Sequence, residues 1–567
     1  MNQTRSLLVF ALLFVAYLIW NQWQADYRTP PPAATAPPPA ASSTAVATAS
    51  VPAAGTASAP AGTPAPLAPT TAATPALAAP HPLVTVTTDV LRLAIDTQGG
   101  SLVRADLLHY PVKPKDTQHP VRLFDDSAER YFVAQSGLVS ANAPAPDHHA
   151  VFRAEQPSYT LAPGQQQLVV TLTWQDPSGL TVKKRYTLQR GSYVVRLSQE
   201  IDNGTVQPWS GNAYRQLVRV PPPVPPKHFL EFYDPERIAY KGAAWYGPEK
   251  KFQKLPFDKF GGEALDQEVT GGWVAMLQHY FFAAWIPSAG ERSRFGSAEL
   301  NEQGTQRYLV RALGPTLTVA PGASATSEAR LYVGPELQSS LDTVAPGLSL
   351  VVDYGIFTVI AQPLHWILAH LHLLVQNWGL AIILLVLLIK GAFFKLSEAQ
   401  FKAGAKMRKL SPRIQALKER YGEDKQKMQQ AMMELYQKEK VNPLAGCLPT
   451  LVQIPVFFAL YYVLMYSVEL RQAPFFGWIQ DLSAPDPYFV LPVLYTLVMI
   501  ATQYLTPTVG MDPTQAKIMK VMPIAFAVMF AFFPAGLTLY YVVNGLTSVI
   551  QQWVITRRIE ADDKAKA

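Results

Sequence analysis

Residues Trp378 to Phe394 read WGLAIILLVLLIKGAFF. This stretch is almost unbroken apolar sequence, long enough to enter a bilayer, yet it carries Lys390. At a rise of about 1.5 Å per residue, Lys390 lies roughly 18 Å along a helix that must cross about 30 Å of hydrocarbon. A charge at that depth costs about 3 kcal/mol and usually faces a partner, a substrate or a hydrated cavity. The alternative is a lysine that snorkels to the nearer headgroups.

Five more apolar runs accompany this one, so the sequence predicts a polytopic α-helical membrane protein with six transmembrane helices. An N-terminal anchor at 1–28 is expected to stay uncleaved, because bulky residues stand where a signal peptidase would need small ones. The remaining spans are predicted at Leu444–Ser467, Phe489–Leu505, Met519–Phe533 and Leu537–Ile555. The two runs at 489–505 and 519–533 are short, which predicts a thinned bilayer beside them.

Charge is concentrated in one segment of the 567-residue chain, whose formal net charge is +7. Between Lys395 and Lys440 there are twelve lysines and arginines against six acidic residues. Such an excess beside a span marks the cytoplasmic side. Apolar residues recur there at helical spacing, which predicts a cytosolic helical hairpin at 397–440, and the tail at 557–567 is also basic. This distribution does not indicate nucleic-acid binding.

Between the anchor and the second span the sequence changes character twice. Residues 29–82 hold 14 of the 49 prolines with much Ala, Ser and Thr, which predicts an extended periplasmic tether. Residues 83–335 alternate apolar and polar side chains, clearest between 168 and 201, which predicts a large periplasmic antiparallel β-sandwich. A linker and an interfacial amphipathic helix are expected at 336–376. The helical core follows at 377–556.

The sequence gives no pattern typical of an enzyme. Its histidines lack a metal-ligand spacing, and nucleophile-elbow and phosphate-loop motifs are missing. His148 and His149 lie in an Ala/Pro-rich loop and are expected to be exposed. The single cysteine, Cys447, excludes an intramolecular disulfide. No catalytic, cofactor or metal site is therefore expected.

Several segments resemble the YidC, Oxa1 and Alb3 family of membrane insertases, in its Gram-negative YidC form. The resemblance covers nearly the whole chain outside the tether. It rests on RSLLVFALLFVAYLIWNQW near the N-terminus, GGWVAMLQHYFFAAWIP at Gly271–Pro287, KVNPLAGCLPTLVQIPVFFALYYVLM, VELRQAPF, DLSAPDPY, FPAGLTLYYVVN and IQQW. It implies a membrane protein insertase and chaperone: a five-helix core around a polar groove that opens to cytoplasm and lipid. The groove cation of the family is usually arginine, and Lys390 stands at that position.

Elementary energetics agree with this implication. Each unpaired polar group of a client costs several kcal/mol in hydrocarbon, and a hydrated groove removes most of that cost. Lys390 can attract acidic client residues, while Gln453 and Gln551 can offer hydrogen bonds. Phe457, Tyr540 and Tyr541 can line a path for the client's apolar helix, or pack as ordinary core. The sequence has no nucleotide motif, so the client's partitioning and the membrane potential are expected to supply the energy.

Two other functions are compatible with the sequence: a secondary transporter with Lys390 as a coupling or substrate site, and an anchored periplasmic sugar-processing enzyme. The insertase interpretation implies nascent membrane-protein clients, the Sec translocon with its accessory subunits, and membrane lipids as partners. It also implies a ribosome and a targeting receptor that bind the hairpin and tail. Both termini are expected in the cytoplasm of a Gram-negative cell, with the chain in the inner membrane.

Overall fold

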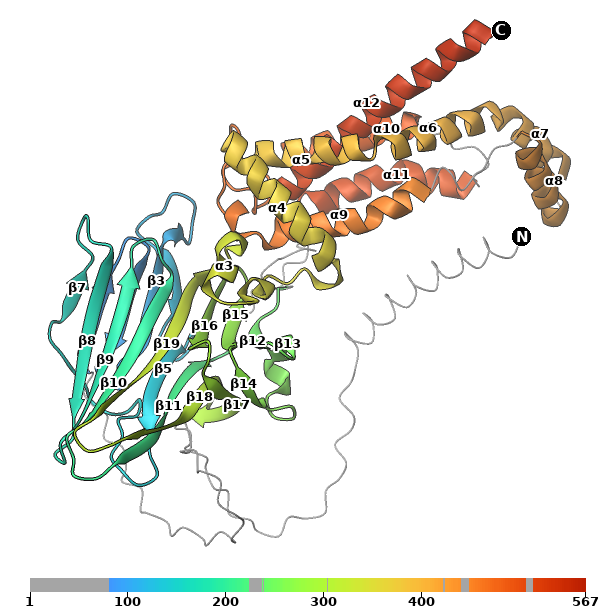
Figure 1. Ribbon diagram of the computed structural model, residues 1–567. Helices are drawn as coiled ribbons and strands as arrows, with labels where there is room; N and C mark the ends of the chain where they lie inside the picture. Colours follow the sequence, from blue (N-terminus) through green and yellow to red (C-terminus); the bar gives the residue numbers. More distant parts are fainter. Residues whose placement is uncertain are drawn as a thin grey trace. The chain divides into compact units, whose positions relative to one another are not determined.

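The computed structural model describes residues 81–223, 237, 239–302, 304–421, 424–439, 448–505 and 513–566. The predicted anchor at 1–28, nearly all of the tether at 29–82, and Cys447 lie outside these residues. Strands occupy the chain as far as Pro335, and helices follow from Gln338 onward (Figure 1).

The strands of the described residues form two large sheets. The first has the order β14-β17-β18-β11-β5-β3-β2-β1-β7, with β4 paired to β3. Its strands are β1 Leu83–Thr87, β2 Leu91–Asp96, β3 Ser101–Pro111, β4 Pro120–Phe124, β5 Phe132–Val139, β7 Ser158–Thr160, β11 Trp209–Arg219, β14 Asp266–Thr270, β17 Arg292–Glu302 and β18 Thr305–Val319. Among the described strands, β1 and β7 form a parallel pair and the others pair antiparallel.

The second sheet has the order β13-β12-β15-β16-β19-β10-β9-β8-β6. Its strands are β6 Arg153–Ala154, β8 Gln167–Gln175, β9 Leu180–Gln189, β10 Val194–Asn203, β12 Gly242–Gly247, β13 Lys251–Pro256, β15 Trp273–Gln278, β16 Phe281–Pro287 and β19 Ser324–Pro335. Strands β8, β9 and β10 pair antiparallel in chain order and run side by side in Figure 1, which confirms the meander predicted between 168 and 201.

The core of the sandwich lies between the two sheets. On β9 every second residue from Leu180 to Leu188 is buried, because successive side chains of a strand point to opposite faces. Tyr186 of β9 and Leu93 of β2 belong to one apolar cluster drawn from both sheets. The period of two in the sequence therefore marks the inward face.

One inward position of β9 holds Lys184, whose side chain is fully buried. Its ammonium donates hydrogen bonds to the carbonyl oxygens of Gly99 at 2.6 Å and Ser136 at 2.7 Å, and lies 4.9 Å from the ring centre of Phe152. Burial lowers the pKa of Lys184 to about 7. A buried donor needs acceptors, so this lysine ties the second sheet to segments belonging to the first.

The expectation that His148 is exposed is wrong. Its side chain is buried, its Nδ1 lies 2.6 Å from the hydroxyl of Tyr214, and its backbone N–H donates to the same hydroxyl. Burial lowers the pKa of His148 to about 4. The Ala/Pro-rich composition of the loop gives no sign of this contact, because Tyr214 lies 66 residues further along the chain.

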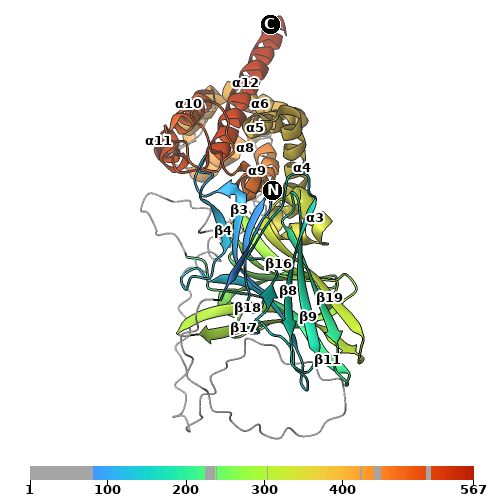
Figure 2. The same ribbon diagram turned by 90° about the vertical axis from the view of Figure 1, so that its left-hand side faces the viewer.

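Ten helices stand in the described residues after the sandwich. They are α3 Gln338–Val344, α4 Thr358–Val375, α5 Trp378–Ala392, α6 Phe394–Lys409, α7 Ser411–Tyr421, α8 Lys425–Lys438, α9 Leu448–Tyr466, α10 Val490–Leu505, α11 Pro513–Phe530 and α12 Ala535–Lys566. Helix α12 contacts α5, α9 and α10, and α4 contacts α5 and α9. Figure 2 shows α5, α10 and α12 gathered together.

Three helix boundaries differ from the predictions. Helix α5 ends at Ala392, and the chain bends by 67° before it continues as α6. Helix α11 begins at Pro513, six residues before the predicted start, as suits a residue favoured in the first turn. Helix α12 continues through the basic tail to Lys566, because that tail consists largely of good helix formers.

Two segments of the described chain are long and apolar enough to cross a membrane, if the bent pair is counted as one span. They are Gly355–Val375, and Trp378–Ala392 joined to Phe394–Met407. The apolar parts of α9, α10 and α11 are shorter, at Leu451–Tyr466, Val490–Leu505 and Val521–Phe530. Helix α4, predicted to lie at the interface, buries Ala361, Leu364, His365 and Leu368 on one side.

Candidate functional site

Lys390 of α5 is a buried charged residue of the helical region. Lys390 is only 7% exposed, and its ammonium donates a hydrogen bond to the hydroxyl of Ser548 on α12 at 2.7 Å. The Ser548 hydroxyl in turn donates to the carbonyl oxygen of Asn544 at 2.8 Å. An ammonium carries three donors, and Ser548 is the hydrogen-bond partner that the described residues supply. The lysine therefore faces α12 and links the two helices.

The polar residues of α12 continue along one face. Tyr541, Asn544, Ser548 and Gln551 are spaced by three, four and three, so their side chains leave the same side of the helix. The side-chain oxygen of Gln551 is buried and has no hydrogen-bond partner in the described part of the chain. Sequence reasoning selected Tyr541 and Gln551 but missed Asn544 and Ser548, which the same spacing would have found.

Aromatic side chains form a cluster beside this polar face. The ring of Phe457 on α9 lies 5.3 Å from Tyr541 and 6.4 Å from Tyr540. Tyr541 also lies 5.3 Å from Tyr495 of α10 and 4.5 Å from Phe530 of α11. The cluster joins four helices and contains the three aromatic candidates Phe457, Tyr540 and Tyr541.

Gln453 is the remaining candidate of the predicted groove. It is half-buried on α9, one turn before Phe457. No hydrogen bond within the described residues joins its side chain to Lys390 or to Gln551. The structure thus bonds Lys390 to Ser548, gathers the three aromatic residues and puts Gln551 on the polar face of α12.

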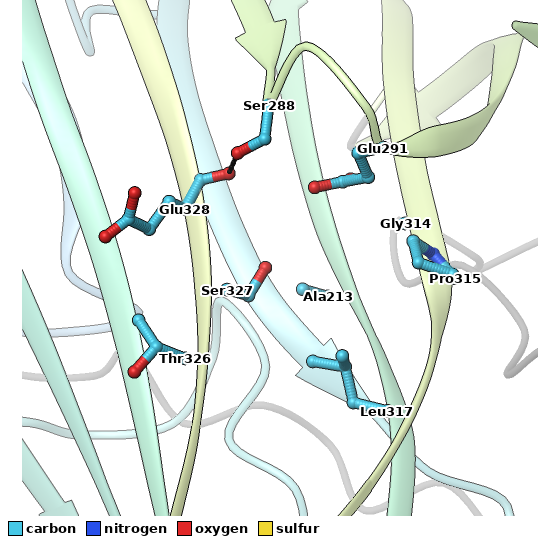
Figure 3. A pocket seen from close by; sticks show the side chains of 9 residues that line it. All are labelled: Ala213, Ser288, Glu291, Gly314, Pro315, Leu317, Thr326, Ser327 and Glu328. Carbon is cyan, nitrogen blue, oxygen red and sulfur yellow. Dashed lines mark hydrogen bonds between the residues drawn. The ribbon is translucent and has the colours of Figure 1, made fainter. Parts of the chain in front are cut away.

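A sugar-processing enzyme would need a substrate site in the sandwich, and one cavity lies there (Figure 3). It encloses about 380 Å³, and its wall includes Glu291, Ser288 and Glu328. The carboxylate of Glu291 accepts a hydrogen bond from the buried guanidinium of Arg215 at 2.5 Å, and Ser288 donates to the carbonyl oxygen of Glu328 at 3.1 Å. The carboxylate of Glu291 and the hydroxyl of Ser288 therefore have partners within the sandwich, and the described residues hold no group of metal-ligating side chains.

Two family models match the chain. One, described as the YidC periplasmic domain, covers residues 83–367, and the other, described as the 60Kd inner membrane protein, covers residues 370–563. The first match covers the sandwich and the second covers most of the helical region, so the two families follow each other along one chain.

Full-length relatives agree with the family models. The membrane protein insertase YidC of Xanthomonas campestris pv. campestris (strain 8004) is 48% identical over 578 residues, which is 100% of this chain and 99% of the relative. That of Stenotrophomonas maltophilia (strain R551-3) is 47% identical, over 98% of this chain and 97% of the relative. A crystal structure of an active YidC insertase is 19% identical over 83% of this chain and 93% of that chain, with a TM-score of 0.36.

The two family models and the full-length relatives define a bacterial inner membrane protein with a periplasmic β-domain and a helical membrane region. The chain belongs to the YidC family of membrane protein insertases. The resemblance seen in the sequence is confirmed. The family is one of insertases and not of enzymes, so the transporter and the sugar-processing enzyme are set aside.

Proposed function

We propose that the chain inserts client proteins into the inner membrane by receiving their polar segments at a groove lined by α5, α9 and α12. The observation that carries this proposal is the buried ammonium of Lys390, which the described residues bond to a single neutral hydroxyl. A lysine in an apolar membrane helix is costly, and such residues usually mark a functional site. Here its ammonium bonds to Ser548 of the neighbouring helix α12.

The chemistry of such a groove follows from its residues. Lys390 attracts an acidic residue of the client by Coulomb force, which is worth about 1 to 4 kcal/mol at 4 Å for effective dielectrics between 80 and 20. The unpartnered amide oxygen of Gln551 and the side chain of Gln453 accept or donate hydrogen bonds that the client's backbone would otherwise lack. Phe457 and Tyr541, which are half-buried, offer an aromatic wall for the client's transmembrane helix, and the buried ring of Tyr540 packs against Tyr541.

Short helices shorten the path that the client must cross. The 16 residues of α10 correspond to about 24 Å and the 18 residues of α11 to about 27 Å, against roughly 30 Å of hydrocarbon. A bilayer beside these helices thins to match them. The energy for insertion comes from burial of the client's apolar helix and from the membrane potential.

The proposed topology has both termini and the helices α7 and α8 in the cytoplasm, and the sandwich in the periplasm. The excess of basic residues between Lys395 and Lys440, together with Arg557 and Arg558, supports this orientation. This basic surface is suited to dock a ribosome or a targeting receptor, and the membrane region to associate with the Sec translocon and with lipids. Nascent membrane proteins are the proposed clients.

Photo-crosslinking in lipid vesicles tests the groove directly. A crosslinking amino acid is placed at Ser548, which contacts Lys390, or at Ile550, which is 59% exposed on the same helix. A small client that inserts without ATP is expected to crosslink from position 548 and not from position 550. Equal yields from both positions would refute a groove at this face, and absence of insertion in the vesicles would refute the function itself.

A further inference from the structure

A second cavity, distinct from the one in Figure 3, carries an excess of positive charge. It encloses about 350 Å³ and is lined by side chains from both sheets. Four cationic residues and one acidic residue, Asp125, contribute to its wall. The cationic residues are Arg122 of β4, Arg130, Arg219 at the end of β11, and Lys241 just before β12.

Arg219 is the most deeply buried of these cations, at 3% exposure. Its Nη2 donates to the side-chain oxygen of Gln278 at 2.9 Å and its Nε to the carbonyl oxygen of Val220 at 3.2 Å. The guanidinium lies 4.3 Å from the ring centre of Phe132. Its Nη1 is buried without a hydrogen-bond partner, and no carboxylate of the described residues pairs with it. Burial lowers the pKa of Arg219 to about 9.

A buried guanidinium without a counterion is unfavourable, because desolvation is not offset by a nearby negative charge. The other deeply buried arginine of the sandwich, Arg215, has a carboxylate as its counterion. Arg215 is fully buried, and it pairs with Glu291 at 2.5 Å and donates to Ser327 and to the carbonyl oxygen of Glu328. The contrast indicates that the Arg219 cavity is built for an anion that comes from outside the described residues.

The position of the cavity near the end of a membrane helix indicates where that anion comes from. Its wall includes His279, at the turn between β15 and β16, and the ring of His279 lies 5.9 Å from that of Tyr466, the last residue of α9. The neighbouring Tyr280 hydroxyl donates to the carbonyl oxygen of Met465 at 3.2 Å. Burial lowers the pKa of His279 to about 4, so this residue is neutral at neutral pH. The cavity therefore adjoins the point where a membrane helix ends.

We infer that the cavity around Arg219 binds the phosphate of an anionic phospholipid headgroup from the outer leaflet. Arg219 contributes to the wall of the cavity and has an N–H without a partner among the described residues, and Arg130 and Lys241 add positive charge to the same wall. The volume admits a headgroup larger than inorganic phosphate. The inference rests on the proposed topology, which puts the Tyr466 end of α9 at the periplasmic surface. Its consequence is that a lipid of the inner membrane fixes the sandwich against the periplasmic surface of that membrane.

Lipid binding is measured on the full chain released from detergent micelles, by native mass spectrometry. The probes are dihexanoyl phosphatidylglycerol, dihexanoyl phosphatidylcholine and inorganic phosphate. Replacement of Arg219 can disturb the packing on Phe132, so the first variant is Arg130→Gln with Lys241→Gln. Its matched control is Arg92→Gln with Arg153→Gln, which removes two exposed cations elsewhere on the sandwich. Arg219→Met is the second variant.

The wild type and the control are expected to retain phosphatidylglycerol in preference to the other two probes. The Arg130/Lys241 variant is expected to bind it roughly tenfold more weakly, and Arg219→Met to lose the preference for anionic lipid. Unchanged affinity in the Arg130/Lys241 variant would overturn the site. Equal affinity for phosphate and phosphatidylglycerol would overturn the lipid as its ligand.

One more variant separates an internal occupant from a lipid. The chain between 224 and 236 follows the cavity residue Pro223 and contains Glu231, Asp234 and Glu236. If phosphatidylglycerol binds only after these three are changed to their amides, the chain's own carboxylates are the ligand and the inference is overturned. The assay measures binding and not insertion, so its outcome is independent of the proposed function.

Discussion

Replacing Lys390 by alanine removes the buried cation of α5 and with it the hydrogen bond to Ser548. Folding is expected to survive, because the loss of a charge-assisted hydrogen bond, about 1.5 to 3 kcal/mol, is matched by the removal of a cation that costs about 3 kcal/mol in a membrane helix. Ser548 still donates to the carbonyl oxygen of Asn544, so it is not left as an unsatisfied donor.

Insertion by the Lys390→Ala protein is expected to depend on the client. A client aspartate loses an attraction of about 1 to 4 kcal/mol, which corresponds to a factor of about 5 to several hundred in a binding equilibrium. A hydrated groove puts the effect near the lower end of that range. A client with a neutral tail loses much less, and Lys390→Arg is expected to support both clients because the charge is kept.

The assay compares insertion into vesicles of two clients that differ by one aspartate in the translocated tail, at matched protein levels. Ser548→Ala serves as a control that removes the hydroxyl and keeps the charge, and it is expected to affect both clients alike. Equal insertion of the two clients by Lys390→Ala, at the unmutated level, would refute the groove. That result would instead support a lysine that only snorkels.

Three further changes test other parts of the structure. Gly272→Ala puts a Cβ 2.1 Å from the carbonyl oxygen of Tyr246, so it should destabilise the sandwich by about 1 to 3 kcal/mol in thermal unfolding, whereas Gly290→Ala meets nothing within 4 Å and should be neutral. Burial raises the pKa of Glu336 well above 4.5. The folded chain then keeps a proton that the unfolded chain loses, so wild-type stability falls as pH rises from about 4.5 toward the folded pKa. The advantage of Glu336→Gln should therefore grow by up to about 1.4 kcal/mol per pH unit, and a constant advantage from pH 5 to 7 would contradict this. Deletion of 397–440 should weaken ribosome binding, and the remaining binding should be less sensitive to salt; unchanged binding and salt dependence would count against the docking role.

Local patterns were enough to predict most of the fold. The alternation between 168 and 201 predicted three antiparallel strands, and the apolar runs predicted α5, α9, α10 and α12 close to their observed places. What failed depends on distant residues. His148 is buried by Tyr214, and Lys184 appeared in the sequence as one inward position of a strand without any sign of its acceptors on Gly99 and Ser136.

The candidate site was predictable in part for the same reason. Lys390 is conspicuous because a charge interrupts an apolar run, and Tyr540 and Tyr541 because they belong to a recognisable motif. Ser548 is an ordinary residue in its own sequence context, and only the packing of α12 on α5 makes it the partner of Lys390. The cavity around Arg219 was invisible for a stronger reason, since its wall comes from several strands far apart in the chain.

The 67° bend after Ala392 has an electrostatic consequence for Lys390. The peptide dipoles of α5 add up along its axis, so the end of the helix carries roughly half a negative charge, and Lys390 lies in its last turn. A cation there gains about 0.3 to 1 kcal/mol, or more where it is partly buried. A helix that ran straight from Trp378 to Met407 would have no terminus at this depth, and the same ammonium would lie in an uninterrupted dipole. The break in the helix therefore puts a partial negative charge close to the buried ammonium, although the start of α6 at Phe394 offsets part of it.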